Sequence, residues 1–161
     1  MARRLSLVLV LTFLGCGSST TPPRGVGDVT LDVAVTRVSG SPTIRAEVRN
    51  DQTVAIRHGV GCSFWGPGMQ LFFLDAKGRK LHFGPAGPLC PDGIAVLQSA
   101  GRLDAATILG GILYTEAGDP MPMQPGTYTA VVVFGWASVE DLNVPWQVRE
   151  KRVVFHWPVL Q

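Results

Sequence analysis

The chain has 161 residues, of which 46% are hydrophobic and 16% are charged, and this balance indicates a globular protein and excludes a disordered one. The formal net charge of +2 includes Arg3 and Arg4, and the rest of the chain has 12 basic and 12 acidic residues. Apart from Arg3 and Arg4, the formal charges of the chain therefore cancel. Without an excess of positive charge the protein would not attract the phosphates of a nucleic acid, so we expect no nucleic-acid partner.

The first 15 residues have the pattern of an export signal. Two arginines precede an apolar run at residues 5–14, which is the order of charged and hydrophobic regions in such signals. A membrane-spanning helix needs about 20 apolar residues, so this run is too short to be one. We therefore predict a signal peptide at residues 1–15.

The sequence Thr-Phe-Leu-Gly-Cys at residues 12–16 resembles the lipobox of bacterial lipoproteins, with Gly15 directly before Cys16. The resemblance implies that Cys16 is lipidated, becomes the new N-terminus, and anchors the protein to a membrane of the bacterial cell envelope, inner or outer. The alternative is an ordinary secretory signal with a cysteine near its cleavage site.

The residues after Cys16 predict a tether followed by one domain. Residues 17–23 are small polar residues and paired prolines, which cannot bury enough apolar surface to fold. We therefore expect a flexible tether at residues 16–27. The remaining residues, 28–161, are enough for one domain with a single core.

Cys62 and Cys90 remain as a pair if Cys16 carries lipid. An oxidising compartment favours a disulfide bond between them, and closing this loop of 28 residues would stabilise the fold by roughly 3.5 kcal/mol. Free thiols are the main alternative. A metal or redox pair is disfavoured, because neither cysteine belongs to a C-x-x-C motif.

Alternation of apolar and polar residues predicts strands along the whole domain. It is clearest at residues 29–38 and 43–49, where it predicts the core-facing residues Leu31, Val33, Val35, Ile44, Ala46 and Val48. The other predicted strands are 53–57, 69–74, 79–83, 127–134, 151–157, and one buried strand ending at Tyr114 within the apolar stretch 103–114.

Turn signals separate these strands. Asp75-Ala76-Lys77-Gly78 predicts a hairpin between residues 69–74 and 79–83, with Gly78 supplying the positive φ of the turn. Residues 59–68 are too rich in glycine to form the interior of an element. The pair Gly110-Gly111 argues against a helix in the stretch 103–114.

The segment Pro125-Gly126-Thr127-Tyr128 resembles the start of a late strand in immunoglobulin-like domains, where a tyrosine hydroxyl bonds back to the backbone. The predicted fold is therefore an all-β, immunoglobulin-like antiparallel β-sandwich of about seven strands. A strand ending near Asn50, the D-x-x-G hairpin and this late strand also resemble, more weakly, the BsuPI family of proteinase inhibitors. That similarity implies the same fold.

No motif in the sequence predicts catalysis, a cofactor or a metal site. His58, His82 and His156 are scattered singly, and we expect them to be surface or partly buried strand residues. We therefore predict that the protein is not an enzyme, although a catalytic site assembled from distant loops would leave no such motif.

Four aromatic residues are the candidates for a binding surface. Phe64 and Trp65 lie in the glycine-rich segment, and Trp136 and Trp146 flank residues 137–145. Tryptophans on loops of a rigid scaffold often form recognition surfaces, but they can also close the ends of a core. We predict a membrane-anchored envelope lipoprotein that binds an envelope protein or glycan, with proteinase inhibition as the alternative function.

Overall fold

The computed structural model describes residues 28–61, 65–84, 93–140 and 142–158, and these residues form strands and connecting segments without any helix. The strands are β1 (Val29–Val38), β2 (Ser41–Asn50), β3 (Ile56–Val60), β4 (Met69–Leu74), β5 (Lys80–His82), β6 (Gly93–Leu97), β7 (Arg102–Ile108), β8 (Ile112–Tyr114), β9 (Pro120–Pro122), β10 (Gly126–Ser138) and β11 (Gln147–Trp157). The all-β class is confirmed. The expected number of about seven strands is too low, because the described residues contain eleven.

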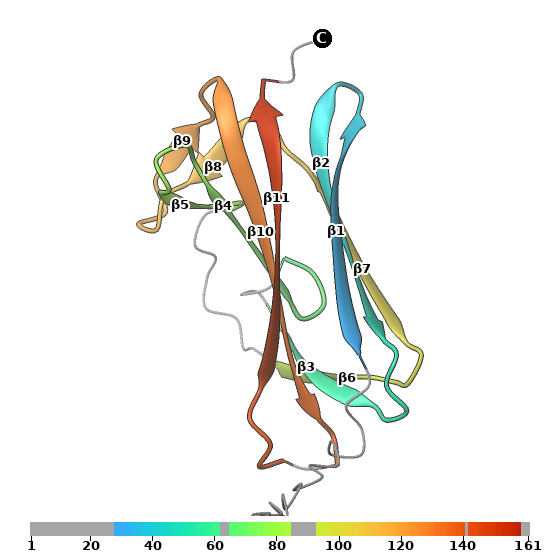
Figure 1. Ribbon diagram of the computed structural model, residues 1–161. Coiled ribbons are helices and arrows are strands. Elements are labelled where there is room, and N and C mark those ends of the chain that lie inside the picture. The colour runs from blue at the N-terminus through green and yellow to red at the C-terminus, as the bar shows by residue number, and fades with distance from the viewer. Residues whose placement is uncertain (1–27, 62–64, 85–92, 141, 159–161) are drawn as a thin grey trace, which may run out of the picture.

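Two antiparallel sheets pack face to face (Figure 1). Sheet A has the order β1-β2-β7, and sheet B has the order β6-β3-β10-β4-β5-β8-β9 with β11 paired to β10. Sheet B curls as a half-barrel, because β10 pairs with β4 over one part of its length and with β3 at its end. The molecule is therefore a sandwich of one small, regular sheet and one large, curled sheet.

The core lies between the two sheets, as the alternation predicted. Leu31, Ile44, Ala46 and Val48 are buried, and Val33 and Val35 pack against the same cluster. From sheet B, β10 supplies alternate side chains to this core, namely Tyr128, Ala130, Val132, Phe134 and Trp136. The six core-facing residues predicted in the first two strands are thus confirmed.

The apolar stretch 103–114 forms two strands in different sheets and not the single strand that we expected. β7 lies in sheet A and β8 in sheet B, so the chain crosses the sandwich at Leu109–Gly111. Gly111 has φ +84°, and a Cβ atom there would lie 2.9 Å from Cζ2 of Trp157. The glycine therefore permits both the turn and the close approach of the tryptophan.

The side-chain amide of Asn50 is fully buried at one end of the sandwich. It bonds to both connections that pass between the sheets there, from β2 to β3 and from β6 to β7. Its Nδ2 donates to the carbonyl oxygens of Val54 (2.9 Å), Gln98 (3.0 Å) and Leu97 (3.3 Å), and its Oδ1 accepts from the backbone N–H of Gln52 (3.2 Å). Because Gln52 and Val54 make these hydrogen bonds, the segment 52–54 does not belong to a strand. β3 begins at Ile56, three residues later than the predicted strand.

The hairpin of β4 and β5 forms at the predicted turn. The N–H of Gly78 donates to the carbonyl of Asp75 at 2.9 Å, and Gly78 has φ +76°. The Asp75 carboxylate accepts from the backbone N–H groups of Lys77 and Arg79 and from Nε of Arg79. Partial burial acts to raise the pKa of Asp75, but these hydrogen bonds outweigh it, and the pKa is lowered.

The first prediction concerns Asn50. Asn50→Ala should lower the free energy of unfolding by about 2–3 kcal/mol, because three buried or partly buried carbonyls lose their donor. Ser99→Ala is the control: it removes only the hydroxyl that donates to the carbonyl of Gln52, and should cost about 0.5–1.5 kcal/mol. Urea denaturation of both variants measures the difference. Equal costs would show that the buried amide has no special role.

The second prediction concerns acid stability. Because its folded pKa is lowered, Asp75 adds stability above the unfolded value near pH 4 and loses it as the pH falls through the folded pKa. Wild type should therefore be more stable than Asp75→Asn at neutral pH, and the gap should close below about pH 4. Urea denaturation at a series of pH values tests this, and a gap independent of pH would contradict it. Arg79→Gln, which keeps the backbone donors, should retain part of the dependence.

Candidate functional site

Four of the predicted site residues lie outside the described residues. These are Cys16, Cys62, Phe64 and Cys90, so lipidation and the disulfide bond stay predictions. The other three, Trp65, Trp136 and Trp146, are described and lie in different environments. Only Trp146 exposes a large part of its side chain.

Trp136 lies in a strand and not on a loop, because β10 continues to Ser138, four residues beyond the predicted end. Its side chain is 4% exposed, and its ring stacks on Phe134 with the centroids 5.8 Å apart. The Arg149 guanidinium lies 5.9 Å from the centroid of the Trp136 ring. In this structure Trp136 closes one end of the core, as the alternative interpretation of the aromatic residues proposed.

Trp65 begins a loop that fills the gap between the two sheets (Figure 1). Its N–H donates to the carbonyl of Met69 at 2.8 Å, and its partly buried side chain packs against the core. A Cβ atom on Gly66 would lie 2.6 Å from Cβ of Ala105 in β7. The glycine-rich segment therefore serves packing here, because only glycine fits so close to the facing sheet.

His58 is more buried than the sequence suggested, with 2% of its surface exposed on the inner side of β3. Its Nδ1 lies 3.0 Å from the carbonyl oxygen of Gly59, and its ring lies 6.0 Å from that of Phe134. A Cβ atom on Gly68 would lie 2.8 Å from this Nδ1. The expectation of a surface or partly buried histidine is wrong, because the loop covers the ring.

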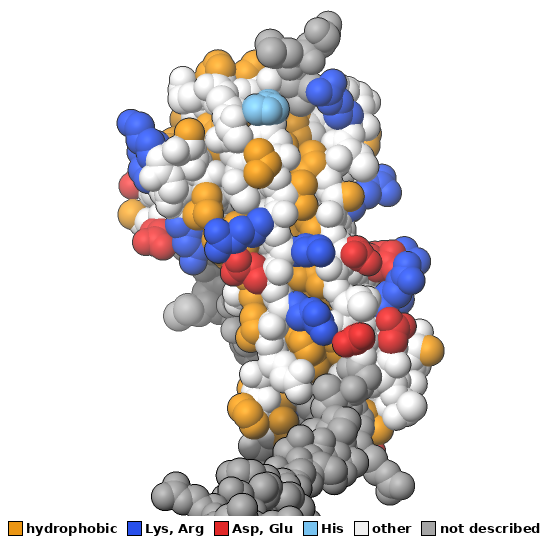
Figure 2. All heavy atoms as spheres, in the orientation of Figure 1, with side chains coloured by type: hydrophobic (Ala, Val, Ile, Leu, Met, Phe, Trp, Pro, Cys, Tyr) orange, Lys and Arg blue, Asp and Glu red, His pale blue; other side chains and the backbone are white. Residues whose placement is uncertain are grey.

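The outer face of sheet B has an exposed group of apolar side chains at the end where β10 passes into β11. Its members, which we call the apolar face, come from β6, β11 and the connection between β10 and β11. They are Ile94 (63% exposed), Val96 (52%), Leu142 (72%), Trp146 (47%) and Val148 (63%). Figure 2 shows hydrophobic side chains at this end, near the start of β11.

The strand register places Ile94, Val96 and Val148 on the same outer face of sheet B. Val96 pairs with Arg57, and Arg57 pairs with Ala137 of β10. In the adjoining row Ile94 pairs with Gly59, and Val148 pairs with Gly135. Arg57, Gly59 and Gly135 lie between these apolar residues, and Trp146 lies over Gly135 and beside Arg57.

Arg57 and Gly135 hold Trp146 against the sheet. The Arg57 guanidinium lies 5.7 Å from the centroid of the Trp146 ring, and its Nη2 donates to the carbonyl of Leu142 at 3.0 Å. Cε3 of Trp146 lies 3.8 Å from the position of a Cβ atom on Gly135. These contacts restrict the orientation of the Trp146 side chain at the surface.

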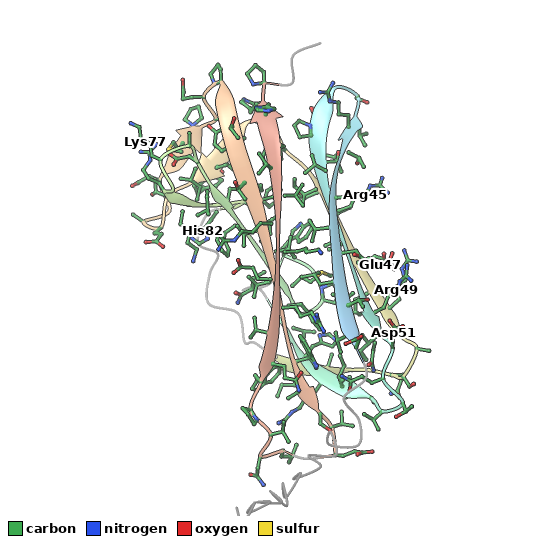
Figure 3. The ribbon with its side chains drawn as sticks, in the orientation of Figure 1. Arg45, Glu47, Arg49, Asp51, Lys77 and His82 are labelled. Atoms are coloured by element: carbon green, nitrogen blue, oxygen red, sulfur yellow. The ribbon has the colours of Figure 1, made fainter. Side chains whose placement is uncertain are left out.

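The outer face of sheet A is charged, and its charges neutralise one another. Glu47 forms ion pairs with Arg49 and with Arg102, and Arg102 also contacts Asp104 at 2.9 Å. The hydrogen bond and charge of Glu47 raise the pKa of Arg49. Figure 3 shows Arg45, Glu47 and Arg49 pointing outward on one side of β2. Arg45 and Glu47 line an open hollow of about 410 Å³. Exposed ion pairs of this kind are typical of a solvated surface.

Within ranges 28–61, 65–84, 93–140 and 142–158, no helix is long and apolar enough to cross a membrane. The same residues contain no group of three or more His, Cys, Asp or Glu able to hold a metal ion. No protein-family model matches the chain, and no curated protein matches it significantly.

The third prediction tests the packing of the loop that begins at Trp65. Gly68 and Gly78 have nearly equal φ values, +70° and +76°, but a Cβ atom meets Cε2 of Phe134 at 2.7 Å in the first case and open space in the second. Gly78→Ala should therefore cost about 1–2 kcal/mol through backbone strain alone. Gly68→Ala should cost about 1–3 kcal/mol more, because it also overpacks the core.

Thermal and urea unfolding of the two variants measure the difference. Equal losses of stability would mean that the loop moves away from the core at little cost.

Proposed function

We propose that this protein is a lipid-anchored module of the bacterial cell envelope that binds another envelope protein through the apolar face and performs no catalysis. The observation that carries the proposal is the group of five exposed apolar side chains around Trp146. Contiguous exposed apolar surface on a folded domain marks interaction sites, because leaving it in water is unfavourable.

The chemistry of the apolar face favours a protein partner over a glycan. Sugars are bound by side chains that combine a flat ring with hydrogen-bond donors and acceptors. Ile94, Val96 and Val148 offer only aliphatic groups beside Trp146. Apolar side chains surrounding a tryptophan and an arginine are the composition of a protein-binding hot spot.

The immunoglobulin-like identity of the sandwich belongs to the same proposal. The Tyr128 hydroxyl donates to the carbonyl of Gln124 and accepts from the N–H of the same residue, both at 3.0 Å. This local closure at the start of β10 is the hydrogen bond expected of a tyrosine corner. It supports an immunoglobulin-like origin, and many secreted binding modules have such domains.

The anchor would place the domain close to the membrane. The tether of residues 16–27 can extend over at most about 40 Å. It leads to Asp28, whose carbonyl accepts from the N–H of Asp51 at 3.1 Å and whose carboxylate lies 3.5 Å from Nη2 of Arg149. Arg149 directly follows Val148, so the tether would join the domain at the same end as the apolar face.

The fourth prediction compares two valines of β11 that are almost equally exposed. Val148, at 63%, belongs to the apolar face, and Val154, at 61%, lies far along the same strand. Tagged full-length protein is cross-linked in intact cells and the captured proteins are identified by mass spectrometry. Val148→Asp should reduce capture of a discrete partner by about tenfold or more, because it places a charge within the interface.

Val154→Asp is the matched control and should leave capture unchanged, and Cys16→Ser should abolish capture if anchoring is required. Equal effects of the two aspartates would contradict the proposed surface. Capture of a proteinase that the purified protein inhibits stoichiometrically would instead support the BsuPI-like alternative.

A further inference from the structure

We infer that β6 is a self-association edge, at which it pairs with β6 of a second copy of this chain. β6 is the last strand on its side of sheet B, and among the described residues its partner is β3 alone. In an antiparallel strand, alternate residues direct their N–H and C=O groups away from the existing partner. Among the described residues, no strand pairs with the other side of β6, so its outward backbone groups are available to a further strand.

The remaining edges of sheet B have features that block such pairing. β9 has the sequence Pro120-Met121-Pro122, and proline has no N–H to donate to a new strand. β11 contains the charged run 149–152 and lies beside β1, where Arg149 contacts Asp28. Prolines, charges and coverage by another element are the usual protections of a sheet edge.

The free edge of sheet A is protected in a similar way. β7 contains the charged residues Arg102 and Asp104, both exposed. A second copy pairing with β7 would therefore have to accommodate these charges.

Within the part of the chain that the structure describes, β6 has none of these protections. Its sequence, Gly93-Ile94-Ala95-Val96-Leu97, contains no charged residue and no proline. Ile94 and Val96 are β-branched, more than half exposed, and on the same outer face. Exposed β-branched residues on an unprotected edge favour the addition of a strand.

A second copy is the occupant that this sequence suits. Antiparallel pairing about a two-fold axis at Ala95 places Ile94 of each copy opposite Val96 of the other, so apolar side chains meet across the axis. A charged residue in such a strand would lie close to its own copy and repel it. β6 has none, so the pairing is self-complementary.

Pairing through β6 would also enlarge the proposed binding surface. A two-fold axis perpendicular to the sheet leaves both outer faces on one side, so the two apolar faces become continuous. Pairing of the five-residue strand β6 with its copy buries less surface than the roughly 800 Å² per partner of a stable complex. The dimer should therefore be weak in free solution. If the protein is lipid-anchored, as proposed above, confinement to a membrane would raise its effective concentration.

Sedimentation equilibrium of residues 16–161 carrying Cys16→Ser tests this inference, because this chain contains every described strand and cannot be lipidated. The average mass should rise from monomer toward dimer as the protein concentration increases. Val96→Lys should abolish the rise by placing a positive charge on either side of the axis, where the two charges repel each other. Val148→Lys, on the same apolar face but away from the edge, is the matched control and should preserve it.

Hydrogen exchange of the unsubstituted β6 segment gives a readout that does not depend on any variant. Its amides should exchange more slowly at high than at low protein concentration. Three results would each overturn the inference. The first is an average mass that stays that of the monomer at every concentration, and the second is hydrogen exchange in β6 that does not depend on concentration. The third is a dimer that still forms in the Val96→Lys variant. Loss of partner capture in Val148→Asp with an unchanged dimer would separate the proposed binding function from self-association.

Discussion

The arrangement of the two sheets depends on one buried amide. Asn50 ends β2 in sheet A, and the chain then crosses to sheet B to form β3. It returns from β6 to sheet A through residues 98–101, and the same side chain bonds to the carbonyls of Leu97 and Gln98. A buried amide must satisfy its hydrogen-bonding groups, so both crossings are held against it. The connection from β2 to β3 and the connection from β6 to β7 are thus held by the same side chain.

The position of the candidate site depends on the two connections that Asn50 holds. β3 and β6 are the strands that adjoin the two crossings in sheet B. β6 contributes Ile94 and Val96 to the apolar face, and β3 contributes Arg57, which contacts Trp146. The rest of the face comes from β11 and the segment after β10, which the register joins to β3 through Ala137. A rigid sheet therefore holds exposed side chains from distant parts of the sequence in one plane, as recognition of a partner requires.

The outer faces of the two sheets differ in the polarity of the side chains that they expose to water. Sheet A carries arginines and carboxylates that pair with one another, whereas the end of sheet B exposes aliphatic and aromatic groups. Solvation accounts fully for the first face. The second costs free energy in isolation, and the burial of such groups against a partner recovers it. This difference is why the binding hypothesis rests on sheet B.

The sequence alone determined the local structure. Alternation predicted β1 and β4 with their observed bounds and the six core-facing residues of the first two strands, because a side-chain period of two follows from strand geometry itself. The turn at Gly78 and the hydrogen bonds of Tyr128 followed from residues close together in the chain. Trp146 could be named as a candidate, because tryptophan near a loop is visible in the sequence.

Only the tertiary structure decided which residues share a surface and which are covered. Trp136 and Trp146 look alike in the sequence, yet a four-residue extension of β10 buries the first and Arg57 fixes the second at the surface. Ile94 and Val96 gave no signal, because a five-residue apolar strand reads the same whether it is buried or at an edge. Exposure is set by contacts with elements distant in sequence, and local patterns contain no information about those contacts.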